Sequence, residues 1–348
     1  MARTLLLVTG TGRSGTSTMS GTLHHLGLHV PGPYLGANES NPKGFYESRW
    51  SVRFHNDLCR RAGIHIVDAR PDALQRVHAA ITPHDRDALS AFLAERTAGR
   101  AQTVVKDPRT TWTQQLWAEV AGAQGLAVAY VGMLRHPAEV AGSRLANYSR
   151  PGEHEDDAAA AARRRADAIT NVARWINTSL VSEHETRGRR RAFVAYTDLL
   201  ADWRPVMARL ADDLGLTYDV DPASGEPSAV DDFIDGGLRR HRVGWDDLDV
   251  PTELAELAES VWQQQLRLRD DADTPAASAE LDELSARYAA LHQTAAALDA
   301  DGRAGAVRVA EQQWASPERP LAERRVGDVG GRELLRAVGG RVKRRLRS

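Results

Sequence analysis

Near the amino terminus, glycines, hydroxyls and one arginine have the spacing of a loop that binds phosphate. The segment from Gly10 to Ser17 reads GTGRSGTS; it follows the apolar run Leu5 to Val8 and precedes a helical pattern with Met19, Leu23 and Leu26 on one face. A strand, a glycine loop and a helix in this order point backbone amides at an anion. We therefore predict a phosphate site at Gly12, Arg13, Ser14, Gly15, Thr16 and Ser17.

The position of the cation in this loop separates several classes of protein. A P-loop small-molecule or nucleoside kinase places lysine directly after the second glycine and holds a metal with a carboxylate, whereas here Thr16 follows Gly15 and the cation is Arg13. The kinase remains one alternative. A non-catalytic nucleotide-binding module is another, since it needs the loop but no base.

A second cation follows a later strand. Arg135 comes directly after the apolar run Ala127 to Leu134, and Ser143 lies eight residues on, in the next helical pattern. A guanidinium forks onto a phosphate, and a hydroxyl from the second helical turn adds a donor. Alone, the arginine followed by His136 and Pro137 is equally typical of a helix start with proline in its first turn.

Taken together, these two segments resemble the sulfotransferase family that uses 3'-phosphoadenosine-5'-phosphosulfate (PAPS), in its bacterial carbohydrate-type subgroup. In that family a basic residue precedes Ser-Gly-Thr in the 5'-phosphosulfate loop, as Arg13 does here, and an arginine and a serine with the spacing of Arg135 and Ser143 bind the 3'-phosphate. The resemblance implies transfer of a sulfuryl group to an acceptor hydroxyl and release of adenosine 3',5'-bisphosphate (PAP). It implies no metal, because a singly charged sulfuryl group needs less charge neutralisation than a phosphoryl group.

Two weaker segments extend this resemblance over roughly residues 3 to 270. The segment from Phe193 to Leu200 resembles the one that approaches adenine, which implies a role for Tyr196, and Arg239 with Arg240 resembles the basic loop over the 3'-phosphate. One departure is Thr18, because several cytosolic members carry tryptophan there, stacked on adenine. Adenine must be held in another way.

The catalytic base is expected in the segment from Asn41 to Glu47, which resembles a turn on the acceptor side of the bacterial subgroup. Phe45 and Tyr46 would bind the acceptor and desolvate Glu47, raising its pKa toward that of a useful base. Glu39 is the competing base. The alternative for Glu47 is an ordinary early residue of the helix from Ser48 to Ala62.

The segment Lys106-Asp107-Pro108-Arg109 also follows an apolar run. By resemblance Lys106 stabilises the transferring group, as Arg13 does at the leaving oxygen, while Asp107 and Arg109 contact the acceptor. The alternative is that Asp107 caps a helix from Thr110 to Ala123.

Strands alternating with helices must position these residues. Apolar runs predict buried parallel strands, and amphipathic stretches between them predict helices, so we expect a three-layer, P-loop-like α/β fold with a mainly parallel central sheet. In such sheets ligands bind at the carboxyl ends of the strands. The predicted strands are Arg3 to Thr9, Thr103 to Lys106, Ala127 to Leu134 and Ala192 to Tyr196. The predicted helices are Thr16 to Leu26, Ser48 to Ala62, Pro83 to Ala98, Pro137 to Tyr148, Glu153 toward His184, Asp198 to Leu214, Pro251 to Leu268 and Ala279 to Leu298.

Composition limits the partners. The 348 residues carry 45 basic and 47 acidic side chains, so no overall field favours nucleic acid. Cys59 is the single cysteine, which excludes an internal disulfide and fits a cytoplasmic protein. We expect a sulfotransferase domain over 1–270, a helical extension over 271–300 and a basic, partly flexible tail over 301–348 that contacts a membrane surface or is simply solvated. The expected acceptor is a sugar, glycolipid or secondary metabolite; its identity and the oligomeric state are not encoded in these patterns.

Overall fold

The centre of the molecule is a four-stranded parallel sheet. The computed structural model describes residues 3–39, 41–148, 156–234, 237, 242–270 and 274–315. The strands are β1 (Thr4–Thr9), β2 (Gln102–Lys106), β3 (Ala127–Leu134) and β4 (Arg190–Ala195). They lie in the order β2-β1-β3-β4, and every neighbouring pair is parallel. The predicted strands and their parallel arrangement are therefore confirmed, with ends that differ by at most two residues.

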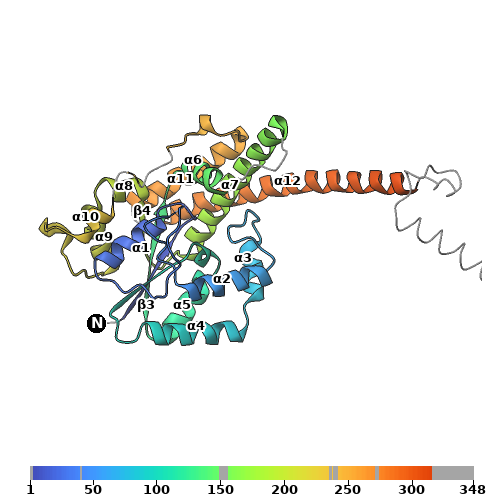
Figure 1. Cartoon of the computed structure of the whole chain (residues 1–348). Helices are drawn as coiled ribbons and strands as arrows, with labels where there is room; N and C mark the ends of the chain where they lie inside the picture. Colours follow the sequence, from blue (N-terminus) through green and yellow to red (C-terminus); the bar gives the residue numbers. More distant parts are fainter. Residues whose placement is uncertain are drawn as a thin grey trace, which may run out of the picture. The chain divides into compact units, whose positions relative to one another are not determined.

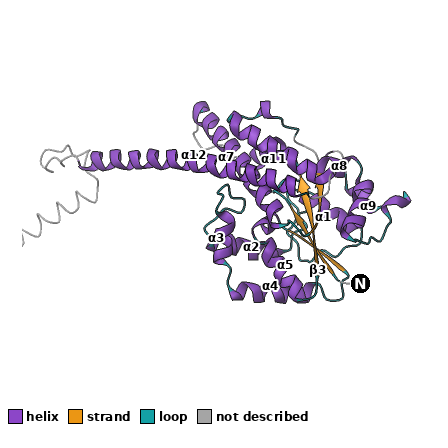
Figure 2. Ribbon diagram, turned by 180° about the vertical axis from the view of Figure 1, so that it is seen from behind, coloured by secondary structure: helices purple, strands orange, loops and turns teal. Residues whose placement is uncertain are grey.

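Helices cover both faces of this sheet (Figures 1 and 2). Alternate side chains of β1 point to opposite faces, so Leu6 and Val8 join one buried cluster and Leu5 and Leu7 another. The first face is covered by α1 (Thr16–His25) and α9 (Trp203–Leu214). The second is covered by α4 (Pro83–Arg96), α5 (Gln114–Ala123), α7 (Asp157–Glu185) and α11 (Thr252–Asp270). The three-layer α/β architecture is confirmed.

Other helices connect these layers, and two of them differ from the predicted pattern. The predicted helix from Asp198 to Leu214 is broken at Asp202, whose carboxylate accepts from the Arg204 amide and starts a new helix. The predicted helix from Thr110 begins instead as a 3-10 turn. The connecting elements are α2 (Arg49–Arg61), α3 (Ala73–Ala80), η1 (Pro108–Trp112), α6 (Pro137–Tyr148), α8 (Tyr196–Ala201), η2 (Pro222–Ser224), α10 (Ala229–Phe233) and η4 (Trp245–Asp247).

The carboxyl end of β1 is pressed against the neighbouring strand β3. Gly10 has φ +124°, and a Cβ atom there would lie 2.6 Å from the carbonyl oxygen of Met133. Only glycine tolerates both this backbone conformation and the close approach. The loop that follows Gly10 therefore starts between β1 and β3, where the strand order changes direction, which is the place where α/β sheets bind ligands.

The chain divides into two compact units, residues 1–292 and 293–348. In the first unit the start of α12 (Pro275–Ala315) buries Leu281, Leu284 and Tyr288 in the cluster of α7 and α11. In the second unit, residues 293–315 are helical and the later ones lie outside the described part. The predicted boundaries after 270 and 300 stay predictions. Within the described ranges, none of the helices is both long and apolar enough for a membrane span.

Replacing Gly10 by alanine tests the close approach of β1 and β3. We expect Gly10→Ala to lower the free energy of unfolding by about 2–4 kcal/mol, because it combines a disfavoured φ with overlap on a strand backbone. Urea unfolding followed by circular dichroism measures the change. The matched control is Gly122→Ala in α5, where a Cβ atom meets nothing within 4 Å and the effect stays within about 1 kcal/mol. Equal stabilities of the two variants would contradict the account.

Candidate active site

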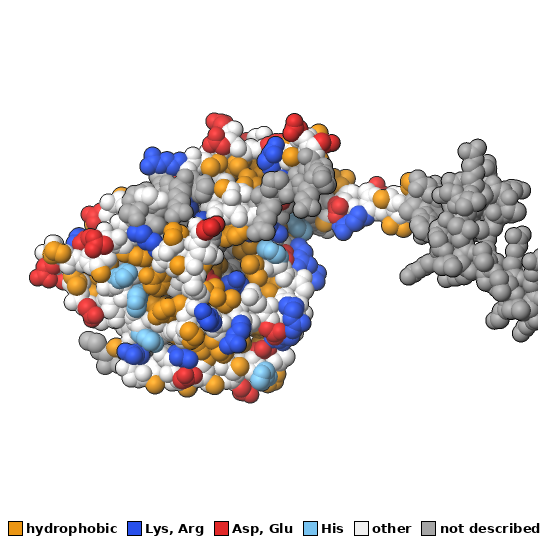
Figure 3. All heavy atoms as spheres, viewed as in Figure 1, with side chains coloured by type: hydrophobic (Ala, Val, Ile, Leu, Met, Phe, Trp, Pro, Cys, Tyr) orange, Lys and Arg blue, Asp and Glu red, His pale blue; other side chains and the backbone are white. Residues whose placement is uncertain are grey.

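A cavity of about 590 Å³ opens at the carboxyl ends of β1, β2 and β3. Among the described residues, its lining includes six cationic side chains, Arg13, Lys106, Arg109, Arg135, Arg144 and Arg174, and a single carboxylate, Glu47. On the outer face seen in Figure 3, by contrast, basic and acidic side chains both occur, with apolar ones between them. The cavity is therefore locally cationic in a chain of nearly neutral charge.

The glycine loop forms one wall of this cavity. Arg13 and Gly15 both have positive φ, +79° and +88°, and a Cβ atom on Gly15 would lie 2.2 Å from the Tyr196 ring. A non-glycine residue in this conformation costs about 1 kcal/mol or more and typically marks a functional turn. Arg13 is held there, because its Nε donates to Ser143 Oγ at 3.0 Å.

The Arg135 side chain ties the loop to β3 and α6. Its Nη1 donates to the carbonyl of Arg13 at 2.9 Å, and its Nε donates to Glu139 at 2.9 Å. Its guanidinium also lies 5.1 Å from the centre of the Tyr196 ring. The structure therefore brings together four residues that we assigned from the sequence to different parts of one ligand: Arg13, Arg135, Ser143 and Tyr196.

A second cavity of about 280 Å³ lies beside the first and shares Arg135 and Tyr196 with it. Trp262 from α11 and Val243 contribute apolar surface to its lining. Thr18 hydrogen-bonds to the Tyr196 side chain rather than presenting a ring. Tyr196, whose ring packs against Gly15, and Trp262 thus both supply aromatic surface to this second cavity.

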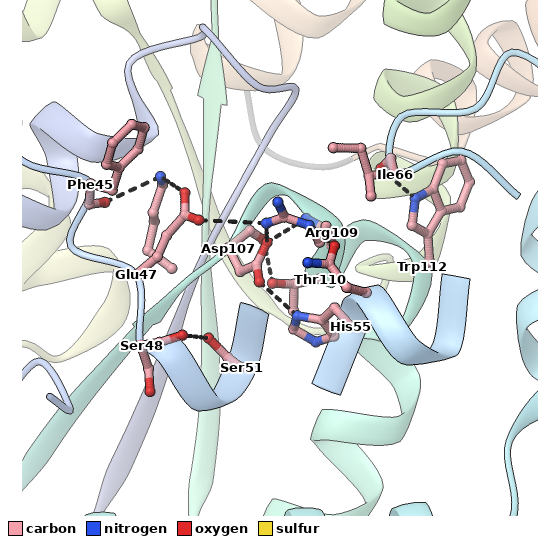
Figure 4. A network of polar contacts seen from close by, with 12 residues as sticks. Phe45, Glu47, Ser48, Ser51, His55, Ile66, Asp107, Arg109, Thr110 and Trp112 are labelled. Atoms are coloured by element: carbon pink, nitrogen blue, oxygen red, sulfur yellow. Dashed lines mark hydrogen bonds and ion pairs between the residues drawn. The ribbon is translucent and has the colours of Figure 1, made fainter. Parts of the chain in front are cut away.

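Lys106 and Glu47 form a buried ion pair on the other side of the loop. Lys106 Nζ lies 2.5 Å from Glu47 Oε1 and donates to Ser17 Oγ at 3.0 Å, and both charged side chains are almost fully buried. The lysine that a nucleotide-hydrolysing loop carries after its second glycine is absent here, yet β2 supplies an ammonium group to the same helix start. Figure 4 shows that Glu47 also faces Arg109, whose Nη1 is 3.5 Å from Oε2.

A chain of polar contacts holds Arg109 in place. Its Nη1 donates to Asp107 Oδ1 at 2.7 Å, and the other carboxylate oxygen of Asp107 lies 2.9 Å from His55 Nδ1. The Trp117 indole donates to His55 Nε2 at 3.0 Å, so the proton of the neutral imidazole sits on Nδ1 and is donated to Asp107. Burial alone raises the pKa of Asp107, but His55 and Arg109 outweigh burial and hold that pKa below its usual range.

Several predicted site residues lie away from the cavity. The Tyr46 ring packs edge-on against Phe233, 5.9 Å between ring centres, and Asp107 has no exposed surface, so neither lines the cavity. Ser14 is likewise buried, 2.5 Å from Thr11 Oγ1. Glu39 is exposed and does not line the cavity.

The expected surroundings of Glu47 also differ from the structure. Two aromatic rings were expected to desolvate this carboxylate, but the Tyr46 ring turns toward α1 and two cations contact Glu47 instead. Asp107 does act as a cap, as its alternative interpretation predicted, but it caps the 3-10 helix η1, where its carboxylate accepts from the Arg109 amide, and not a helix from Thr110 to Ala123. Arg239 and Arg240 lie outside the described residues. The predicted residues that do line the cavity are Gly12, Arg13, Gly15, Thr16, Ser17, Phe45, Glu47, Lys106, Arg109, Arg135, Ser143 and Tyr196.

Sequence patterns missed two arginines of the lining, Arg144 on α6 and Arg174 on α7. Burial, together with the charges of Arg174 and Arg13, lowers the pKa of Arg144 to about 10. Neither arginine belongs to a motif, and Arg174 lies in a long helix rich in arginine. The position of Arg144 directly after Ser143 was the only available signal.

Comparison with known proteins gives weak structural similarities. No protein-family model and no curated protein matches the sequence. The chain is similar to a sulfotransferase domain from the Synechococcus PCC 7002 olefin synthase, with 17% identity, a TM-score of 0.37 and coverage of 83% of this chain and 96% of that one. It is also similar to a sulfotransferase from Mycobacterium tuberculosis (17% identity, TM-score 0.38, 75% and 77% covered). A third similar structure is a retinol dehydratase in complex with androsterone and inactive cofactor PAP, with 13% identity, a TM-score of 0.34 and coverage of 79% of this chain and 84% of that one. Similarities this low carry no argument about the function of this chain.

The buried Asp107 predicts a specific acid sensitivity. A carboxyl group whose pKa is lowered by folding stabilises the fold above its unfolded pKa of about 3.9, and this contribution is lost as the pH falls below that value. We expect Asp107→Asn to lower the free energy of unfolding at pH 7. In this variant, we also expect the free energy of unfolding to fall less steeply as the pH is lowered, by up to about 1.4 kcal/mol per pH unit. Urea titrations between about pH 3 and 7 measure both effects.

The control is Asp212→Asn, which removes a carboxylate from the exposed surface of α9. Its unfolding curve is expected to run parallel to that of the wild type. A parallel curve for Asp107→Asn as well would show that Asp107 is not stabilised by His55 and Arg109.

Proposed function

We propose that this chain is a sulfotransferase that moves a sulfuryl group from PAPS to an acceptor hydroxyl. The observation that carries the proposal is the contact between the two cationic halves of the site. Arg13 Nε donates to Ser143, and Arg135 Nη1 donates to the Arg13 carbonyl. A nucleotide with anionic groups at both ends needs two such cationic positions within reach of each other.

The donor fits the residues around the glycine loop. The amides that start α1, together with Arg13, would hold the 5'-phosphosulfate, and Arg135 with Ser143 would hold the 3'-phosphate. The second cavity next to Arg135 offers Tyr196 and Trp262 as aromatic surface for adenine. This arrangement replaces the stacking tryptophan that the resemblance leads one to expect at Thr18.

Transfer needs one proton acceptor and stabilisation of the leaving oxygen. The acceptor hydroxyl oxygen bonds to sulfur, the bond between sulfur and the 5'-phosphate oxygen breaks, and the hydroxyl proton passes to Glu47. The electron pair of the broken bond stays on the leaving PAP, next to Arg13. Lys106 and Arg109, which hold Glu47 in place, also face the charge that develops on the transferred group.

The acceptor belongs on the side of the cavity that Glu47 and Phe45 line. Leu35, Pro42 and Ile66 add apolar surface to the same lining. An acceptor with an apolar portion next to its hydroxyl, such as a glycolipid or a secondary metabolite, suits this lining as well as a sugar does. Glu39, the competing base, is exposed outside the cavity, which favours Glu47.

Donor binding is the first test of this proposal. Isothermal titration of the full chain should show that PAP binds at least tenfold more tightly than ADP, because Arg135 and Ser143 act on the 3'-phosphate that ADP lacks. Arg13→Ala should lower PAP affinity at least tenfold, whereas Arg49→Ala, a solvent-facing arginine at the start of α2, should leave it unchanged. Tighter binding of ATP than of PAP would instead favour a kinase.

The second test separates an enzyme from a binding module. Glu47→Gln should keep the contact with Lys106 and bind PAP within threefold of the wild-type affinity, yet transfer label from radioactive PAPS about 10²–10⁴-fold more slowly. The acceptors are a panel of phenols, sugars and sugar phosphates. Glu39→Gln, which removes the competing base, should transfer at the wild-type rate. Equal transfer by the Glu47 variant and the wild type would rule out Glu47 as the base.

A further inference from the structure

Arg144 is held in position by neutral groups. Its Nε donates to Asn171 Oδ1 at 2.8 Å, and its guanidinium lies 5.5 Å from the centre of the Tyr148 ring. Asn171 is buried, so this contact fixes the direction of the side chain. Within the described part of the chain, no acceptor is in hydrogen-bond contact with the two Nη groups of Arg144, which lines the cavity.

Arg174 approaches the same place from the next helix. It lies one turn after Asn171 on α7, so the two side chains share a helical face, and it lines the cavity together with His65 and Arg144. Two carboxylates in its surroundings are already engaged: Asp68 with Arg70 at 2.8 Å and Asp167 with Arg163 at 3.5 Å.

The two arginines therefore form a cationic pair on which Asp68 and Asp167 act only from beyond ion-pair distance. Among the described residues, no carboxylate lies within ion-pair distance of Arg144 or Arg174. Both side chains are half-buried, and burial lowers the pKa of each. Two like charges kept together in a partly dry cavity weaken the fold unless a ligand compensates for them.

Arg144 lies close to the glycine loop and to Pro108. A Cβ atom on Gly12 would lie 3.8 Å from Arg144 Nη1 and 4.0 Å from Pro108 Cβ, so Arg144 and the segment that carries Lys106 and Arg109 flank the same loop residue. The groups assigned to the donor are Arg13, Arg135 and Ser143. Gly12, Glu47 and Arg144 all line the one cavity, and a ligand that contacts both charged groups lies within it.

We propose that Arg144 and Arg174 bind an oxyanion of the acceptor, so that the acceptor carries a phosphate, sulfate or carboxylate group in addition to the hydroxyl that is modified. The proposal rests on the proposed function, since it takes the loop to be filled by the donor. Two guanidinium groups that line one cavity are suited to recognising such a planar or tetrahedral anion.

The experiment uses the full chain saturated with PAP, so that the glycine loop is filled, and titrates it with inorganic phosphate, sulfate and acetate. We expect at least one anion to bind, and its affinity to fall at least tenfold in both Arg144→Met and Arg174→Met, while PAP affinity stays within threefold. The anion that binds with the highest affinity indicates whether the acceptor carries a phosphate, a sulfate or a carboxylate. Without added anion, both variants should also melt at a higher temperature than the wild type.

The matched control is Arg165→Met, on the helix α7 that also carries Arg174. The Arg165 side chain is exposed and pairs with Asp249 at 2.9 Å, so this variant should bind the anions like the wild type. The proposal is overturned if no anion binds the PAP-loaded protein, if both variants bind it unchanged, or if both lose PAP affinity tenfold. The last result would place the arginines in the donor site. If PAP does not bind the wild type but the arginine-dependent anion binding persists, the proposed function fails and the anion site stands.

Discussion

Burying charge at the carboxyl end of β2 is the constraint on which the site depends. Glu47, Lys106 and Asp107 are almost fully buried, and isolated charges in such surroundings cost several kcal/mol each, so every one of them must have a partner. Lys106 meets Glu47, and Arg109 bridges Glu47 to Asp107. His55 and Trp117 complete the chain from α2 to α5. Removing a member takes a partner from at least one buried neighbour, so the polar chain links the base, the loop before α2 and the end of β2.

The glycine loop adds a second constraint, in backbone geometry rather than charge. Gly10 must fit under the β3 backbone, and Gly15 must fit under the Tyr196 ring, while Arg13 takes a left-handed conformation that is unfavourable for its side chain. The contacts of Arg13 with Ser143 and Arg135 hold this turn. The strained turn is thus stabilised by contacts of Arg13 and Arg135, the same two cations that are proposed to bind the two ends of the donor. Stability of the loop and binding of the donor therefore depend on the same side chains.

Local sequence patterns predicted much of the fold and part of the candidate site. The strands are continuous apolar runs, and the loop and the pair Arg135 and Ser143 are defined by short spacings, so both were predictable. The partners of Glu47 could not be predicted, because Lys106 and Arg109 lie about 60 residues away in the sequence. The direction of the Tyr46 ring, toward Phe233 and not toward the carboxylate, is likewise decided by tertiary packing. Arg144 and Arg174 were missed for a related reason. An arginine on an amphipathic helix is usually solvated, and nothing in the sequence marks two that face a cavity.

A crystal structure of the full chain with PAP tests the central claim most directly. The account predicts the 5'-phosphate on the loop from Gly12 to Ser17, beside Arg13, and the 3'-phosphate on Arg135 and Ser143. Adenine should lie against Tyr196 or Trp262, and Arg144 should make no contact with the nucleotide. A 3'-phosphate bound by Arg144 and Arg174, or a nucleotide held by one end only, would contradict the account.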